Sequence, residues 1–251
     1  MKNIHTFVAK KYVAVVSIII FVVFCFAVVL GCFKKTELVI GEAYSNIVVI
    51  DAGHGGIDGG SVGKTTGVLE RDLNLEYAKT LSNLLNQFGI GVVMTRTNKN
   101  GLYDSNAQNL KRSDMKKRKE IIDNSRADIV VSIHMNSFPL KQCRGAQTFY
   151  NKENDKGKLL ATSIQEQFIK ELPYAKSDAV VGDYYITNCT KIPAVIVECG
   201  FISNPEEEAL LLDKEYREKV CYAVLCGIIG FLGDKGNWVL CFLYKKLKNK
   251  C

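Results

Sequence analysis

The sequence has few of the residues that usually build a metal site or a disulfide framework. It contains three histidines in 251 residues, no two cysteines with two residues between them, and no His-Glu-x-x-His segment. This argues against a cysteine-bound zinc ion and against the helix-borne metalloprotease motif. The nine cysteines are odd in number and scattered, so a disulfide framework is not expected. Three lie in apolar stretches, where a thiol packs as a small hydrophobe, and two are expected to be exposed: Cys199, Cys221 and Cys226, then Cys143 and Cys251.

The central part of the chain also lacks an excess of positive charge. Of the formal net charge of +7, residues 1–35 carry +5 and residues 234–251 carry +4, so residues 36–233 carry −2. A basic groove for nucleic acid is therefore not expected, and the basic ends fit a position near a membrane. The sequence shows no internal repeat or low-complexity segment, and an apolar content of 47% is sufficient for one domain with a core.

One uncharged stretch near the start is long enough to cross a bilayer as a helix. We expect five segments: a cytoplasmic N-terminus at 1–11, an uncleaved transmembrane signal anchor at 12–33, a spacer at 34–44, the folded domain at 45–233 and a basic tail at 234–251. The alternative is a lipoprotein with lipid on Cys32, because the segment VLGC loosely resembles a lipidation box. Both hypotheses place the folded domain outside the cytoplasm.

The apolar pattern of the folded domain alternates between strand and helix signals. Short β-branched runs predict strands, and apolar residues at helical spacing predict helices; the strands are expected at 47–50, 90–95, 128–133, 145–150, 184–187 and 194–197, and the helices at 70–88, 113–125, 158–172 and 214–231. This order predicts an α/β domain whose mainly parallel sheet of about six strands has helices on both faces. The lysines and arginines of 113–125 are expected to form a solvated face. The polar loop 97–112 is long, so we expect a lid, a substrate-contacting element or a plain insertion.

Four polar side chains stand at places where parallel sheets hold their ligands. His54 follows the first strand in a glycine-rich loop, His134 follows a second strand, Glu198 ends a third, and Glu70 opens the helix after the His54 loop. The carboxyl ends of neighbouring parallel strands meet at one edge, so we expect these side chains to converge. Two imidazoles and one carboxylate are a standard ligand set for catalytic zinc, and a second carboxylate can act as general acid and base. For either histidine alone, a hydrogen-bonded loop residue is the alternative.

Six segments in a fixed order extend this pattern over residues 48–207: VVIDAGHGGIDGGSVG, GVLERDLNLEYAKTLSNLL, VVMTR, ADIVVSIHMNS, GAQTFY and IPAVIVECGFISNPEE. Through them the sequence resembles the zinc-dependent N-acetylmuramoyl-L-alanine amidases of bacterial cell walls. The resemblance implies a single α/β domain with zinc on His54, Glu70 and His134 and with Glu198 as the catalytic acid and base. It also implies hydrolysis of the amide between the lactyl group of muramic acid and L-alanine in peptidoglycan.

The branch of the family that the sequence resembles most is the germination-specific one, because of GAQTFY, VECGFISNPEE and the lone domain behind an anchor. This implies action on spore cortex, as a step towards muramic-δ-lactam, at a membrane-anchored, extracytoplasmic position such as the space between forespore and mother-cell membranes. The alternatives are a vegetative autolysin and a catalytically silent wall-binding scaffold. An accessory activator protein at the cell surface or forespore is a further candidate partner.

Three more residues are candidates for supporting roles, and one for a rival mechanism. Asp51 is expected to hold a ligand histidine in its tautomer, as carboxylates behind metal sites do. Asn136 and Arg96, both near strand ends, are expected to contact substrate or to brace a loop, with bracing favoured. The rival within enzymes is a cysteine hydrolase with Cys199 as nucleophile, although no motif that would activate this thiol surrounds it.

Overall fold

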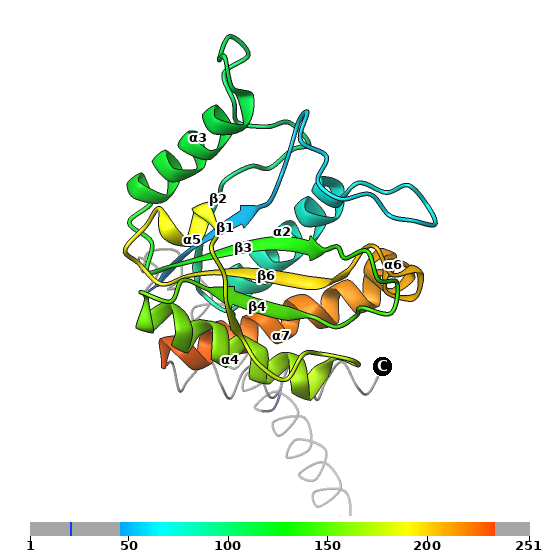
Figure 1. Ribbon diagram of the computed structural model, residues 1–251. Coiled ribbons are helices and arrows are strands. Elements are labelled where there is room, and N and C mark those ends of the chain that lie inside the picture. The colour runs from blue at the N-terminus through cyan, green and yellow to red at the C-terminus, as the bar shows by residue number, and fades with distance from the viewer. Residues whose placement is uncertain (1–20, 22–45, 234–251) are drawn as a thin grey trace, which may run out of the picture. The chain divides into compact units, whose positions relative to one another are not determined.

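The computed structural model describes Phe21 and residues 46–233 (Figure 1). The predicted anchor, spacer and basic tail lie outside these residues, Phe21 apart, and stay predictions. Within the described part, none of the helices combines the length and the apolar character that a bilayer span requires.

The described residues form one six-stranded sheet with the order β2-β1-β3-β6-β4-β5. The strands are β1 (Ile47–Ala52), β2 (Gly91–Met94), β3 (Ile129–Asn136), β4 (Gln147–Tyr150), β5 (Val180–Val181) and β6 (Ala194–Phe201). The first four in this order are parallel, as predicted, but β4 runs antiparallel to β6 and β5 follows the direction of β4. The sheet is therefore mixed, because the loop from β3 to β4 is too short for the crossover that a parallel strand requires.

Helices cover both faces of the sheet, as the alternating pattern predicts (Figure 1). One face carries α2 (Glu70–Gln87), α4 (Asp155–Glu171) and α7 (Lys214–Leu232), which enclose the larger apolar cluster. The other face carries α3 (Leu110–Asn124) and the short α5 (Tyr185–Asn188), with a smaller cluster between them and the strands.

The predicted strand at 184–187 is wrong, because α5 begins at Tyr185 and Tyr184 is the residue just before it. Its aromatic and β-branched residues favour a strand, but Ile186 packs into the smaller cluster, and the Thr187 hydroxyl donates to the Tyr184 carbonyl over one helical turn. The sequence pattern also gave no sign of α6 (Pro205–Leu212), which is too short for a clear apolar period. Proline opens this helix, and the Asn204 side chain caps it by accepting from the next backbone amides.

The cysteines follow the predicted pattern in part. Cys199 and Cys221 are buried free thiols in the larger cluster, and Cys143 is a half-buried free thiol. The sequence predicts that Cys226 packs as a small hydrophobe without a disulfide. It does pack in the larger cluster, but it is disulfide-bonded.

Candidate metal centre and active site

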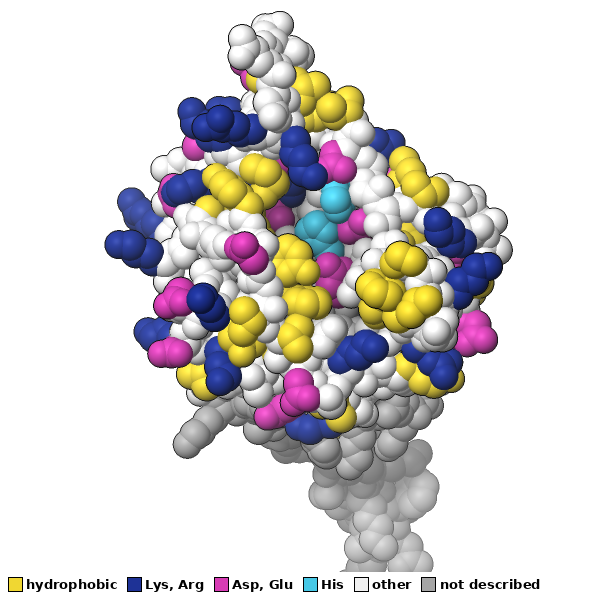
Figure 2. Space-filling view, viewed as in Figure 1, with side chains coloured by type: hydrophobic (Ala, Val, Ile, Leu, Met, Phe, Trp, Pro, Cys, Tyr) yellow, Lys and Arg dark blue, Asp and Glu magenta, His cyan; other side chains and the backbone are white. Residues whose placement is uncertain are grey.

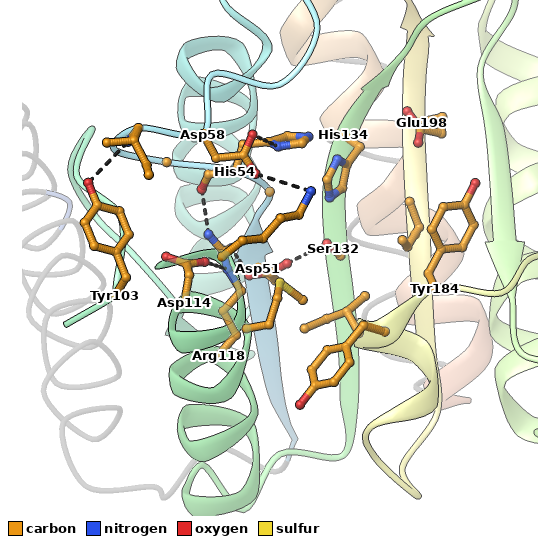
Figure 3. Close-up of a pocket in the computed structure, with 18 of the residues that line it drawn as sticks. Asp51, His54, Asp58, Tyr103, Asp114, Arg118, Ser132, His134, Tyr184 and Glu198 are labelled. Atoms are coloured by element: carbon orange, nitrogen blue, oxygen red, sulfur yellow. Dashed lines mark hydrogen bonds and ion pairs between the residues drawn. The ribbon is translucent and has the colours of Figure 1, made fainter. Parts of the chain in front are cut away.

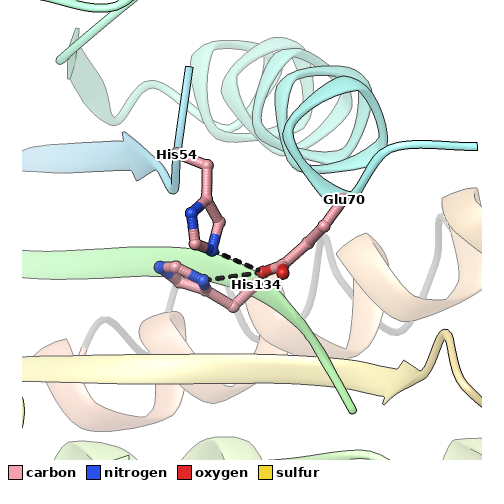
Figure 4. Close-up of side chains that lie close together, drawn as sticks. All are labelled: His54, Glu70 and His134. Carbon is pink, nitrogen blue, oxygen red and sulfur yellow. Dashed lines mark hydrogen bonds and ion pairs between the residues drawn. The ribbon is translucent and has the colours of Figure 1, made fainter. Parts of the chain in front are cut away.

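Three of the predicted site residues meet at the carboxyl edge of the sheet (Figure 4). One oxygen of Glu70, Oε1, lies 3.1 Å from His54 Nε2 and 2.9 Å from His134 Nδ1. The two imidazole rings stand edge to face with their centroids 4.9 Å apart. One ligand atom from each residue lies within 4.8 Å of the other two, which is the spacing of a group that can surround one cation.

Local backbone features bring the histidines together. His54 has a φ of 60°, a left-handed conformation that side-chain-bearing residues rarely adopt, and this turns the chain sharply after β1. Gly53, just before it, lies against the other imidazole: a Cβ atom there would sit 2.2 Å from His134 Nε2. The residue before His54 must therefore be glycine for His134 to occupy its place.

Glu70 is the first residue of α2 and is held from two sides. Its Oε2 accepts from the Ser61 amide at 2.8 Å, and its Oε1 accepts from the Asn74 side chain at 3.3 Å. Burial alone would raise the pKa of this carboxyl, but the hydrogen bonds and charges of His134 and His54 hold it well below its usual range. Burial likewise opposes protonation of His54, yet Glu70 and Asp58 raise its pKa above the usual value. The centre is thus built around a carboxylate that stays ionised.

Glu198 lies beside this group on the neighbouring strand. It is the register partner of His134 across β3 and β6, and it is 8% exposed. Burial raises the pKa of its carboxyl to about 7. Its Oε2 is buried and accepts no hydrogen bond from any of the described residues. A buried carboxyl with a free oxygen next to two imidazoles has the properties of a general acid and base.

A cavity of about 510 Å³ opens from these residues towards α3 and α5 (Figure 3). In the space-filling view the histidines are visible at the bottom of the hollow, between acidic and apolar side chains (Figure 2). The strands contribute Asp51, Ser132, His134, Ile196 and Glu198; one wall contains Tyr103, Lys111, Asp114, Met115 and Arg118, and the other contains Asp183, Tyr184, Tyr185 and Ile186. The predicted loop 97–112 ends earlier than expected, because α3 begins at Leu110; the loop borders the site through Tyr103, and Lys111 reaches it from the first turn of α3.

Asp51 does not support a ligand histidine in the predicted way. Asp51 makes no hydrogen bond to His54 or His134; it accepts from Thr95 at 2.7 Å, from Ser132 at 2.6 Å and from Arg118. Burial would raise the pKa of Asp51, but the Arg118 charge and these hydroxyls hold it at about 2. The carboxylate that lies against the other ring nitrogen of His54, the one turned away from Glu70, is Asp58, whose Oδ1 lies 2.9 Å from His54 Nδ1.

Arg96 braces a loop, as the favoured prediction has it. Its guanidinium is buried and donates at 2.8 Å to the carbonyls of Ala52, Gly53 and Arg71. Asn136 is partly exposed at the end of β3, and its backbone carbonyl accepts from the Ile202 amide at 2.9 Å. Its contact with substrate stays a prediction.

Cys199 has none of the properties of an activated nucleophile. It is fully buried on β6 within the larger cluster, and burial raises the pKa of its thiol well above the usual value. A reactive thiol needs the opposite shift and access to substrate. The geometry therefore weighs against the cysteine hydrolase hypothesis.

Sequence reasoning missed Asp58, Arg118, Tyr103 and Tyr184. Only Asp58 had a usable signal, since it lies four residues after His54 in the same glycine-rich loop. The others come from loop 97–112, α3 and the segment before α5, and only the folded chain brings them to the cavity.

A family model of N-acetylmuramoyl-L-alanine amidases matches residues 48–230 of the chain. The chain belongs to this family. This chain is 34% identical to the germination-specific N-acetylmuramoyl-L-alanine amidase of Bacillus subtilis (strain 168). The alignment of 196 residues covers 76% of this chain and 81% of that protein.

Solved structures of similar amidases share the fold. The CwlD amidase from Clostridioides difficile, solved in complex with the GerS lipoprotein, is 37% identical with a TM-score of 0.72 over 75% of this chain and 99% of that one. The catalytic domain of the amidase CwlV from Bacillus (Paenibacillus) polymyxa var. colistinus is 30% identical with a TM-score of 0.67 over 76% of this chain and 99% of that one. The chain is thus an N-acetylmuramoyl-L-alanine amidase with peptidoglycan as its substrate.

Proposed function

We propose that the amidase binds zinc through His54, Glu70 and His134 and hydrolyses the amide between N-acetylmuramic acid and L-alanine with Glu198 as acid and base. The observation that carries this proposal is the convergence of two imidazoles and one carboxylate within 4.8 Å, with Glu198 on the adjoining strand. Nitrogen and oxygen donors in this number leave a position open, as catalytic zinc sites require. The free Oε2 of Glu198 is the group that would face a water there.

The chain's own residues divide the work of hydrolysis. When bound, zinc would polarise the substrate carbonyl and lower the pKa of a water molecule. Glu198 takes a proton from the attacking water and delivers it to the amine of L-alanine as the amide bond breaks. In the metal-free chain burial raises the pKa of this carboxyl to about 7, which favours the protonated form that delivers a proton to the leaving amine. The cavity between α3 and α5 is the place for the substrate.

In this proposal the amidase acts on spore cortex outside the cytoplasm. The similarity to a germination-specific amidase supports spore cortex as the substrate and muramic-δ-lactam formation as the process that uses the bared muramic acid. An extracytoplasmic position behind an anchor at residues 12–33 agrees with such a substrate. The CwlD amidase was solved with a lipoprotein, which supports a lipoprotein as accessory partner here too.

Digestion of purified peptidoglycan tests the chemistry. The full chain is incubated with cortex or vegetative peptidoglycan, with zinc or with a chelator, and the products are identified by mass spectrometry. We expect free stem peptides and peptide-free glycans with zinc, none with chelator, and none from Glu70→Gln.

Glu206→Gln is the matched control, because Glu206 is an exposed carboxylate and should leave activity unchanged. Release of peptides in the presence of chelator would contradict the zinc proposal. Equal digestion of both peptidoglycans would favour a general cell-wall amidase over a cortex enzyme. A chain that binds zinc and muropeptide but releases nothing alone would favour the scaffold or the need for a partner.

A further inference from the structure

Arg118 is a buried cation next to the site, contrary to the expectation of a solvated face for this helix. It lies in α3 and is 1% exposed. Its Nε donates to Asp114 Oδ2 at 2.6 Å, and its Nη1 donates to Asp51 Oδ1 and, at 2.8 Å, to the Ala52 carbonyl. Its Nη2 donates to the His54 carbonyl at 2.6 Å (Figure 3). One guanidinium thus connects α3, β1 and the backbone of a predicted metal ligand.

The backbone of His54 needs external support. Its φ of 60° is unfavourable for a residue with a side chain. The next two residues, Gly55 and Gly56, have φ values of 140° and 60°, which glycine adopts as one of many accessible conformations. The local sequence therefore permits this turn without specifying it. Two hydrogen bonds hold the His54–Gly55 peptide: its N–H donates to the Asp58 carbonyl at 2.9 Å within the loop, and its carbonyl accepts from Arg118 at 2.6 Å, which is the bond that ties it to α3.

We propose that Arg118 is a positioning residue for His54: by fixing the His54 carbonyl it holds the imidazole towards Glu70 and His134. The inference rests on the proposed zinc function, because the imidazole is positioned for the metal. The two carboxylates that flank the guanidinium, Asp51 and Asp114, balance its charge, so the buried cation is stable in this place.

The planar shape of the guanidinium is what this role requires. Arg118 serves four acceptors with three nitrogens, and these acceptors come from a helix, a strand and a loop. A lysine ammonium is a compact point charge on a single chain, so it can stay near the carboxylates but cannot also hold both carbonyls. Arg118→Lys therefore separates the positioning of His54 from the balance of charge.

Arg96 provides a matched comparison. It is also a buried arginine, 3% exposed, and it braces the same loop through the carbonyls of Ala52 and Gly53. Arg96 makes no hydrogen bond to His54 within the described residues. Arg96→Lys thus loosens the loop in general, while Arg118→Lys also releases the His54 carbonyl.

The experiment measures metal binding rather than activity. Zinc affinity of the full chain is determined by competition with a chromophoric chelator, and the visible spectrum of the cobalt-loaded chain reports the ligand geometry. The variants are Arg118→Lys, Arg96→Lys and the exposed Arg112→Lys on the same helix, with apparent melting temperatures recorded without metal. We expect Arg118→Lys to weaken zinc binding roughly 10- to 100-fold and to change the cobalt spectrum, as loss of a group that orients a metal ligand does.

The outcomes separate this inference from the function on which it rests. Equal zinc affinity and cobalt spectra for Arg118→Lys and wild type, or equal weakening by Arg96→Lys, would overturn the positioning role. A wild-type chain that binds neither metal would instead overturn the proposed zinc site. If Arg118→Lys does not fold, Asp114→Asn serves in its place: it removes a carboxylate that orients Arg118, and unchanged zinc affinity in that variant would equally overturn the inference.

Discussion

The two faces of the sheet differ in what their strand residues do. On β1, β3 and β6 the side chains that point to α2, α4 and α7 are apolar along the whole strand, as Ile50, Val131 and Val197 illustrate. On the opposite face the same strands begin with Val49, Val130 and Ala194 and then become polar towards their carboxyl ends. Asp51, Ser132, His134 and Glu198 occupy that polar end.

The comparison shows how one sheet separates stability from chemistry. Alternate residues of a strand point to opposite faces, so a strand can contribute to a dry core and to a reactive cavity at the same time. The active face therefore contains buried charges that need partners. Arg118 forms an ion pair with Asp51, and Arg96 donates hydrogen bonds to backbone carbonyls. We expect substitutions on the two faces to have separable effects.

The largest effect should come from Glu198→Gln on the active face. Loss of the proton-transferring carboxyl should lower kcat roughly 10²- to 10⁴-fold, the usual contribution of general acid and base catalysis. Zinc content and thermal stability near pH 5 should stay close to wild type, because the amide has the same shape as the neutral carboxyl. Metal analysis and stem-peptide release measure both; a variant within tenfold of wild-type kcat would rule out this role for Glu198.

A matched isoleucine pair tests the difference in packing between the faces. Ile133 and Ile196 are 1% and 3% exposed, but Ile133 packs in the larger cluster whereas Ile196 lines the cavity. We expect Ile133→Ala to lower the free energy of unfolding by about 4 kcal/mol and Ile196→Ala by about 2 kcal/mol. Ile196→Ala alone should raise KM. Denaturant titration measures the two stability losses, and steady-state kinetics measures KM. If the two variants lose the same stability and have the same KM, the two faces do not differ in this way.

The pH dependence of stability should also come from the active face. The folded pKa of Glu198, about 7, exceeds its usual value of 4.5, so the folded state keeps a proton that the unfolded state releases. In metal-free protein this carboxyl should therefore destabilise the fold as pH rises from 4.5 to 7, by about 3 kcal/mol at most. Glu198→Gln should be nearly as stable as wild type at pH 5 and more stable at pH 8. Urea titrations in chelator compare the two; parallel pH profiles would show that Glu198 is not shifted in this way.

The smallest effect on activity should come from Cys199→Ala on the core face. The thiol is fully buried among apolar side chains and does not reach the cavity, so activity should stay within about twofold of wild type. The loss of one sulfur atom from the core should lower stability by about 1 kcal/mol. Loss of activity in Cys199→Ala, together with resistance of the wild type to chelator, would revive the cysteine hydrolase hypothesis.

Sequence reasoning worked where one local pattern decides one local structure. The continuous apolar run of β6 and the helical spacing in α2 and α7 are strong signals, and α2 begins at Glu70 as predicted. The predicted strand end at 197 is too early, because β6 continues to Phe201 and Glu198 lies within it. It failed where contacts distant in sequence decide. The residues of α5 have strand-like propensity, and the direction of β4 depends on a short connection and on the position of β6 between β3 and β4.

The residue pattern along the chain is enough to identify the side chains that can carry the chemistry. The pattern puts two histidines and two glutamates near the carboxyl edge that parallel strands share, and they converge because β1, β3 and β6 are neighbours in the sheet. The surroundings of these side chains depend on how distant parts of the chain pack together. The partners of Asp51, the placement of Asp58 at His54 and the burial of Arg118 depend on how α3 and the His54 loop pack on the sheet. A buried arginine and a solvated one look alike in a charged helix, so the folded chain alone distinguishes them.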